Sequence, residues 1–307
     1  ISREFAYHGS TMTGMSLGGM TAMHSQGDMM PGFEHVLPPY WYKYGGDMSH
    51  DDFGIHAANK IEEKINEIGP DNIAAFIGEP IQGAGGVIIP PDTYWPRVQE
   101  ICNQYDILLV VDEVICGFGR TGNWFGSDTY NIKPDIITMA KGITSGYIPL
   151  SGIMICDRVC ETLINEGGEF YHGYTYSGHP VACAVSLENL KIIKEENLIE
   201  QSRNVSVYLE QQMREIEKHP LVGEVRMKSF IGAVELVKDK ETREMFENTG
   251  TVGTICRDHC IENGLVMRAV RDGMIFCPPL IFNNNHVDEL CEKLKTSLNQ
   301  TLDHISK

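Results

Sequence analysis

The chain has 307 residues, of which 42% are hydrophobic and 22% are charged, a balance typical of a soluble globular protein with a sizeable core. Its formal net charge of −17 argues against nucleic acid and against an anionic membrane surface as partners. No apolar run approaches the roughly 20 residues of a membrane-spanning helix. Nine cysteines, spread singly in a chain without a signal peptide, predict reduced thiols in the cytoplasm.

The start of the chain is unusual. It opens Ile1-Ser2-Arg3-Glu4-Phe5, with no initiator methionine, no targeting signal and no helix cap. Such an opening is typical of a continuous fold that is entered part-way. We therefore expect the N-terminal part of the fold to be absent from these 307 residues.

The first half of the chain alternates helices and strands. The spacing of apolar residues predicts two helices and four strands: helices over 52–68 and 91–105, and strands over 73–77, 107–111, 136–139 and 151–156. The strand over 107–111 is apolar throughout, as parallel strands covered on both faces tend to be. This rhythm predicts an α/β fold with a mostly parallel sheet, whose chemistry lies at the carboxyl ends of the strands.

The second half follows a different pattern. It predicts a long helical stretch followed by a small α+β unit: helical over 178–218, a hairpin over 222–237 that turns at Ser229, a helix over 250–263, two strands over 264–278, and a helix from Asn285 onward. We therefore expect a large domain over 1–190, and a linking helix with a smaller C-terminal α+β domain over 191–307.

The strand over 107–111 ends in Asp112-Glu113, which fits the metal-binding carboxylate of an ATPase. That function requires a phosphate-binding loop of the form G-x-x-x-x-G-K-[ST], and the chain contains no Gly-Lys dipeptide. A dinucleotide fingerprint is the second interpretation, because the residues over 117–122 formally satisfy G-x-G-x-x-G. That motif works only where a helix starts at the glycines, and the residues over 123–128 do not predict one.

A third interpretation couples Asp112 with Lys141, which lies just past the strand over 136–139. The two side chains should meet at one edge of the sheet. Pyridoxal phosphate requires a carboxylate for its ring nitrogen and a lysine that forms a Schiff base. An ordinary ion pair explains these two residues equally well.

Five segments decide between these interpretations: Tyr7–Ser10, Gly78–Gly86, Asp112–Gly122, Ala140–Gly142 and Tyr174–Pro180. In sequence, order and spacing they resemble the class III pyridoxal-phosphate-dependent aminotransferases, and the match covers essentially the whole chain. The resemblance is closest to the amine:pyruvate (omega-) transaminase branch. It implies pyridoxal-phosphate fold type I, the cofactor pyridoxal 5'-phosphate, and a homodimer with shared active sites.

The resemblance assigns the cofactor to residues of this chain. Lys141 is implied as the Schiff-base lysine and proton shuttle, and Asp112 as the partner of the pyridinium nitrogen. Tyr7 and Val114 are implied on the two faces of the ring. Thr175 is implied as a hydrogen-bond donor to the cofactor phosphate across the dimer interface.

Three more residues complete the implied site. Glu79 is expected near the ring and the substrate end of the pocket, and His8 next to the stacking tyrosine, which it orients or simply hydrogen-bonds. Arg268 matches the arginine that binds the carboxylate of the keto acid and swings out for an amine. Arg271 is the second choice for that role, with a solvated turn residue as its ordinary explanation.

Two features depart from the family pattern. Ile115 stands where many members that act on α-amino acids carry Gln, as is typical of the amine-specific branch. The upstream Gly/Ser–Glu-Ala segment, whose helix N-terminus binds the cofactor phosphate in the family, does not occur in these residues. Cys256 and Cys260 have a spacing that could suggest a metal, but on the predicted helix both face the core.

The sequence thus predicts an enzyme that moves an amino group from a primary amine or omega-amino acid to pyruvate or a similar keto acid, by a ping-pong route. Two alternatives stay open. One is a catalytically incompetent fragment that keeps the fold but not the site. The other is a different reaction on the same scaffold, an aminomutase or a decarboxylase. The sequence does not identify the amine donor.

Overall fold

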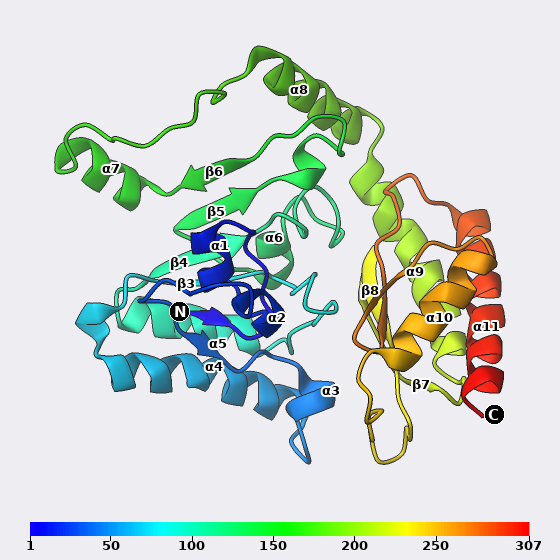
Figure 1. Cartoon of the computed structure of the whole chain (residues 1–307). Coiled ribbons are helices and arrows are strands. Elements are labelled where there is room, and N and C mark those ends of the chain that lie inside the picture. The colour runs from blue at the N-terminus through cyan, green and yellow to red at the C-terminus, as the bar shows by residue number, and fades with distance from the viewer. Residues whose placement is uncertain (307) are drawn as a thin grey trace.

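Two four-stranded sheets carry the fold, and a long pair of helices connects them (Figure 1). The computed structural model describes residues 1–306. The first sheet has the order β3-β4-β5-β6, and the second has the order β7-β8-β10-β9. The elements predicted from apolar spacing are all present, with ends that differ by a few residues.

The first sheet comprises β3 (Ala75–Gly78), β4 (Leu108–Asp112), β5 (Ile136–Met139) and β6 (Gly152–Ile155). The first three strands are parallel, as expected, whereas β6 runs antiparallel to β5. The regular alternation of strands and α-helices ends between β5 and β6. The connection between β5 and β6 holds only the short 3-10 helix η2 (Lys141–Ile143), and a parallel return would need a longer crossover, usually a helix.

Two helices bury the first sheet on one side. They are α4 (His50–Ile68) and α5 (Tyr94–Gln104), which pack against each other and against the strands. The core between them is fully buried and rich in large side chains, including Phe53, Phe76 and Trp95. Their burial gives this half its rigid base, and the strand ends that follow are held by it.

Several short elements escape a sequence-based prediction because none spans more than nine residues. They are β1 (Ser2–Arg3), α1 (Met12–Leu17), α2 (Thr21–His24), β2 (His35–Val36), α3 (Trp41–Tyr44), α6 (Gly126–Tyr130) and α7 (Asp157–Asn165). β1 pairs with β2, and the N-terminal amine donates to the Ala75 carbonyl at 2.9 Å. The opening residues therefore join the first sheet layer.

The long helical stretch divides into α8 (Pro180–Glu195) and α9 (Leu198–Ile216). The break lies at Asn197, whose φ of 51° is left-handed and incompatible with a continuous helix. The predicted domain division at 190/191 falls inside α8 and stays a prediction.

The second sheet is antiparallel and comprises β7 (Val222–Lys228), β8 (Ile231–Leu236), β9 (Arg268–Val270) and β10 (Gly273–Phe276). The predicted hairpin turns at Ser229, which adopts a φ of 52°. α9, α10 (Thr251–Glu262) and α11 (Asn284–Ile305) cover this sheet. Cys256 and Cys260 pack in this core, as the sequence predicts.

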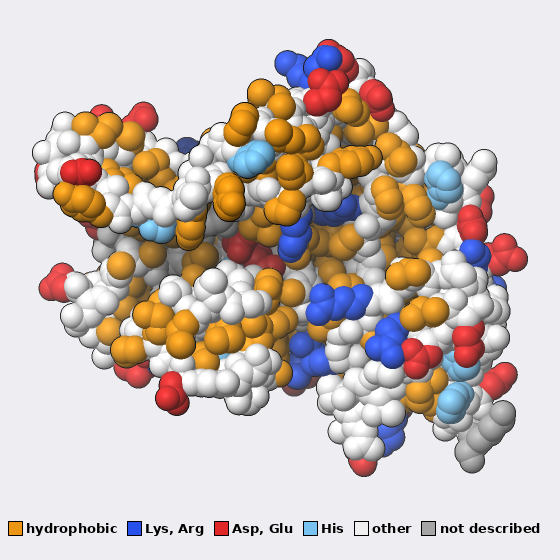
Figure 2. Space-filling view, turned by 45° about the horizontal axis from the view of Figure 1, so that its top comes forward, with side chains coloured by type: hydrophobic (Ala, Val, Ile, Leu, Met, Phe, Trp, Pro, Cys, Tyr) orange, Lys and Arg blue, Asp and Glu red, His pale blue; other side chains and the backbone are white. Residues whose placement is uncertain are grey.

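The segment between β6 and α8, residues 156–179, forms an arm beside the first sheet (Figure 1). α7 has no buried residue, and every residue over 161–178 is exposed. Figure 2 shows hydrophobic side chains gathered over this arm. Between residues 1 and 306, no helix is long and apolar enough to cross a membrane, and no group of three His, Cys, Asp or Glu side chains is arranged to hold a metal.

Candidate active site

The carboxyl ends of β4 and β5 lie next to each other and carry the two residues that the sequence singles out. Asp112 is the last residue of β4 and pairs in register with Thr138 of β5. Lys141 follows two residues after β5 ends, with a φ of 44° in the left-handed region. An exposed lysine and a buried carboxylate therefore stand at one sheet edge, as the spacing predicts.

Asp112 is held from two sides. One carboxylate oxygen accepts the Val114 N–H at 3.0 Å, and the other lies 2.7 Å from His8 Nδ1. The His8 ring is almost fully buried, and its Nε2 is a buried atom without a partner. Next to an ionised Asp112, His8 donates from Nδ1. His8 therefore orients the carboxylate, whereas the sequence leaves two roles open for it, orienting Tyr7 or forming a plain hydrogen bond.

Glu79 lies beneath the site rather than in its opening. The side chain is buried, and its carboxylate accepts the Gly83 N–H at 2.8 Å and the Tyr7 N–H at 3.5 Å. Burial raises the pKa of Glu79 above its ordinary value, while His8 and Arg3 oppose that rise. Glu79 thus ties Tyr7 to the glycine-rich segment 83–86.

Two cavities meet at Lys141. The first, of about 790 Å³, is lined by Val114, Ile115 and Lys141 together with the junction between α8 and α9. The second, of about 500 Å³, is lined by Tyr7, Ile115, Lys141 and Arg268, and its wall includes the glycine-rich segment. The structure thus brings together an amine, an aromatic ring, a branched aliphatic side chain and a guanidinium from four separate parts of the chain.

The two candidate arginines differ in what they contact. Arg268, at the start of β9, is exposed and lines the second cavity. Arg271 donates from Nη2 to the Gly85 carbonyl at 2.6 Å, and its guanidinium lies 4.6 Å from the Phe5 ring centre. Arg271 is therefore engaged with the backbone, and Arg268 is the arginine that faces the cavity.

Thr175 lies in the exposed stretch 161–178, and neither cavity is lined by it. Its expected role, as a donor to the cofactor phosphate of a neighbouring subunit, stays a prediction.

The surroundings of Glu113 and of the glycine-rich turn 117–122 argue against the ATPase and the dinucleotide-binding interpretations. The Glu113 carboxylate accepts the N–H groups of Gly126 and Ser127, at 2.8 and 2.6 Å, and is fully buried. The nearest helix after the glycines, α6, thus has its N-terminal amides bound to this chain's own acid. A pyrophosphate would find no free amides there, and Glu113 has no free oxygen facing a metal.

Some residues of the site carry no signal in the sequence. Met20, Met23 and Cys277 line the second cavity, and Arg120 lines the first. Methionines predict only flexible apolar surface, and the contact between His8 and Asp112 joins residues more than 100 positions apart. Only the tertiary structure brings such pairs together.

Comparison with known proteins supplies the family. The model of the aminotransferase class-III family matches residues 1–298. The chain belongs to this family. Class-III aminotransferases use pyridoxal 5'-phosphate as their cofactor.

Relatives agree with this assignment. The putrescine–pyruvate aminotransferase of Pseudomonas aeruginosa is 56% identical over 303 residues, which are 98% of this chain and 66% of that protein. The diaminobutyrate–2-oxoglutarate transaminase of Halomonas elongata is 41% identical over an alignment of 317 positions, which covers 100% of this chain and 68% of that protein. The chain thus spans about two thirds of the length of these class-III aminotransferases.

Solved structures show the same fold. A thermostable omega transaminase 4-fold mutant from Pseudomonas jessenii has a TM-score of 0.97 at 43% identity, covering 100% of this chain and 69% of that one. A thermostable (S)-enantioselective omega-transaminase from Thermomicrobium roseum has a TM-score of 0.93 at 44% identity, covering 98% and 67%. The fold is therefore pyridoxal-phosphate fold type I, as the sequence predicts.

The residues at the strand ends fit this cofactor. A buried carboxylate suits a protonated ring nitrogen, and Asp112 is such a group, kept in place by His8 and Val114. A primary amine suits the aldehyde, and Lys141 reaches both cavities. The first cavity is large enough for a small aromatic ring with its phosphate.

Proposed function

We propose that the protein is a transaminase that moves the amino group of a primary amine or omega-amino acid to pyruvate or a similar keto acid. The observation that carries this proposal is the position of Lys141. Its amine lies at the junction of two cavities, one beside Val114 and the other lined by Arg268. The activities for which the relatives are named support the same substrate classes, and one of them pairs a diamine with pyruvate.

The chain's own residues divide the work. Asp112 would keep the ring nitrogen of the cofactor protonated, because His8 and Val114 fix its carboxylate at the buried strand end. When bound, pyridoxal 5'-phosphate would supply an electron sink for a substrate carbon that loses a proton. Lys141 would hold the cofactor covalently until the substrate amine displaces it, and its freed Nζ amine would then carry that proton.

The second cavity offers substrates both a charged group, Arg268, and an apolar wall. Arg268 offers a planar guanidinium to the carboxylate of the keto acid, which it binds through two parallel hydrogen bonds. An amine donor carries no carboxylate at that position, so it uses the apolar wall formed by Ile115 and the methionines. The two half-reactions of the ping-pong route therefore differ in their dependence on Arg268.

Reduction with borohydride tests the first step of this proposal. The full-length protein is incubated with pyridoxal 5'-phosphate, reduced and digested, and the modified peptide is mapped. We expect the cofactor on Lys141. Attachment to another lysine would overturn the assignment. A panel of amines with pyruvate or 2-oxoglutarate then identifies the substrates, and turnover without any keto acid would point to an aminomutase or a decarboxylase.

We also propose that the protein works in the cytoplasm as a homodimer with shared active sites. The arm carries large exposed apolar side chains that a second copy would cover, among them Tyr171, Tyr174 and Tyr176, each at least 75% exposed. Thr175 lies between them and would donate to the cofactor phosphate of the partner subunit. All nine cysteines are free thiols, which suits a reducing compartment.

Subunit mixing tests the shared site. Homodimers of K141A lack the lysine, and homodimers of T175A lack the phosphate donor. A mixed dimer contains one site with both residues intact. Random mixing of equal amounts makes half of the dimers mixed, so we expect two poorly active proteins to restore up to a quarter of the wild-type activity per site. Activity that stays at the level of the separate variants would contradict sharing. Light scattering on each sample reports the dimer independently.

A further inference from the structure

Residues 82–88, which include the glycine-rich segment 83–86, form a small closed loop in the wall of the second cavity. Its ends are joined by two backbone hydrogen bonds between Gln82 and Ile88, at 3.1 and 3.0 Å. Gly83, Ala84 and Val87 of this loop line the cavity that Arg268 also lines. The position of the loop therefore helps to shape the space next to Lys141.

Val87 holds an unusual backbone conformation in this loop. Its φ is 51°, in the left-handed region that favours glycine, and its side chain is fully buried. For a β-branched residue this conformation is a genuine outlier, which persists only where surrounding groups impose it. The loop therefore needs an external constraint.

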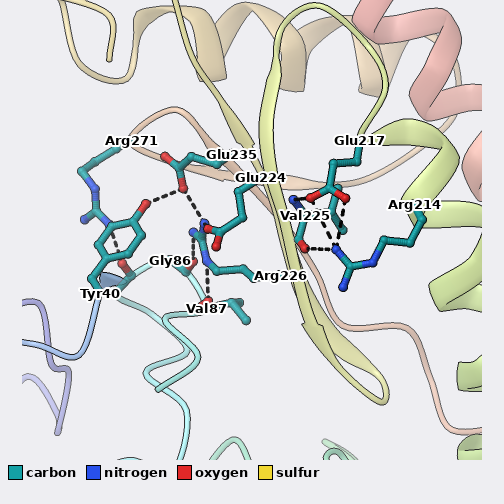
Figure 3. A network of polar contacts seen from close by, with 11 residues as sticks. Tyr40, Gly86, Val87, Arg214, Glu217, Glu224, Val225, Arg226, Glu235 and Arg271 are labelled. Atoms are coloured by element: carbon teal, nitrogen blue, oxygen red, sulfur yellow. Dashed lines mark hydrogen bonds and ion pairs between the residues drawn. The ribbon is translucent and has the colours of Figure 1, made fainter. Parts of the chain in front are cut away.

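Arg226 of β7 supplies such a constraint from the second sheet (Figure 3). Its Nε donates to the Val87 carbonyl at 2.8 Å, and its Nη2 donates to the Gly86 carbonyl at 2.7 Å. Arg271 continues the row by donating to the Gly85 carbonyl. Three successive carbonyls of the loop thus accept hydrogen bonds from guanidinium groups of the second sheet.

The Arg226 guanidinium is itself fixed. Its Nη1 forms ion pairs with Glu235 at 2.7 Å and with Glu224 at 3.0 Å, and the side chain is only 7% exposed. The Tyr40 hydroxyl donates to the same Glu235 carboxylate at 2.5 Å. All three guanidinium nitrogens of Arg226 are engaged. The loop therefore cannot shift relative to the second sheet without breaking a charged hydrogen bond.

The same sheet carries Arg268. β7 pairs with β8, β8 pairs with β10, and β10 pairs with β9, where Arg268 lies. The loop wall and the carboxylate-binding arginine are therefore two faces of one cavity that are joined through Arg226 and this sheet.

We propose that Arg226 is a positioning residue: it holds the strained loop 82–88 against the second sheet and so sets the distance between the loop wall and Arg268. The expected effect of Arg226 on keto-acid binding rests on the proposed function. Its effect on the conformation of the loop does not, because that effect needs neither cofactor nor substrate. A bidentate guanidinium is needed, because a lysine keeps the charge but donates to the two carbonyls from a single atom.

Hydrogen exchange tests the loop directly, in the full-length protein without cofactor. We expect R226K to raise the exchange rates of the Gly86, Val87 and Ile88 amides about 10- to 100-fold, the range set by the loss of one charged hydrogen bond. R214K is the matched control. Arg214 also donates to a backbone carbonyl of the same sheet, that of Val225, but it is half-exposed and does not contact the loop.

The same R226K substitution in a V87G background distinguishes a positioning role of Arg226 from an effect on the general stability of the protein. Glycine adopts the left-handed conformation without strain, so in a V87G background R226K should raise exchange less than threefold. In kinetic assays we expect R226K to raise KM for pyruvate about tenfold, with a smaller change in kcat. If R226K does not fold, Y40F leaves the guanidinium in place and frees Glu235, and a smaller rise in exchange of the same amides is expected.

Two results would overturn the proposal. One is loop exchange that rises equally in R214K and R226K. The other is an R226K effect of equal size in the wild-type and V87G backgrounds. Because exchange is measured without cofactor or substrate, a failed borohydride experiment would remove the proposed function and leave this test intact.

Discussion

The floor of the site and the arm beside it are built in opposite ways. In the floor, Asp112, Glu113 and Glu79 are buried, and each has hydrogen-bond partners from its own chain. In the arm, the residues over 161–178 are all exposed, and large apolar side chains face outward. These floor residues thus find their hydrogen-bond partners within the chain, whereas no part of the chain that the structure describes buries residues 161–178 of the arm.

This difference shows where changes should be costly. A buried charge that loses its partner pays the full desolvation cost, whereas an exposed group exchanges one partner for water. Substitutions in the floor and at its edge should therefore have large effects on chemistry, and substitutions in the arm should have small effects on stability.

Lys141→Ala should have the largest effect. In the proposed mechanism this side chain attaches the cofactor and, once released, moves the proton, so turnover should fall at least about 10⁴-fold. Because Lys141 is exposed, the thermal midpoint should change little. Steady-state assays and a thermal melt measure the two effects. Lys133→Ala, at an exposed position just before β5, is the control and should keep wild-type turnover.

Asp112→Asn should come next. Asparagine can still accept the Val114 N–H, but the negative charge that keeps the ring nitrogen protonated is lost. We expect the chemical step to slow by about 10²- to 10³-fold, each factor of ten being ~1.4 kcal/mol of barrier. Single-turnover kinetics measure that step. A wild-type rate would make Asp112 a structural acid. Asp128→Asn, at an exposed acid in α6, controls for the loss of one charge.

Arg268→Ala should act on one half-reaction. We expect about a 100-fold loss with the keto acid, the value of a charged bidentate contact, and less than a threefold loss with the amine. Equal losses in both halves, measured by single turnover, would mean that Arg268 is structural. Arg257→Ala on α10 provides a control, since its guanidinium pairs only with a neighbouring exposed acid.

Arg158→Ala should have the smallest effect, in the arm. Arg158 joins α7 to the sheet by donating to both oxygens of Asp135, at 2.7 and 2.9 Å. Because the Arg158 side chain is half-exposed, the free energy of unfolding should fall by only about 0.5–1 kcal/mol. Denaturant titrations of both proteins measure this difference, and Arg257→Ala again serves as the reference.

The pH dependence of that difference follows from Asp135. Burial acts to raise its pKa, but Arg158 and the Leu109 N–H outweigh burial and lower the pKa below the ordinary value of 3.8. A lowered acid pKa stabilises the folded state above the unfolded value and stops doing so as pH falls through the folded value. The two proteins should therefore differ by a constant amount above about pH 5 and converge below pH 3.8. A difference that persists in acid would assign the effect to packing.

The elements and the family could be read from local patterns. Apolar spacing marks α4, β4 and the later strands, because a buried face imposes its period on the residues that form it. Asp112 and Lys141 could be placed together because parallel strands end at a common edge. The family pattern then named their roles, which remain predictions until the cofactor is trapped on Lys141.

The sequence by itself therefore determined the strand ends, the pair of reactive side chains and the family. The tertiary structure alone decided which groups hold them: His8 against Asp112, Arg226 against the loop, and the antiparallel turn of β6. These contacts join residues separated by up to 140 positions, so no local period records them. The contact of Arg226 with the loop depends on how the two sheets dock, and docking is set by the summed packing of both cores rather than by any one segment.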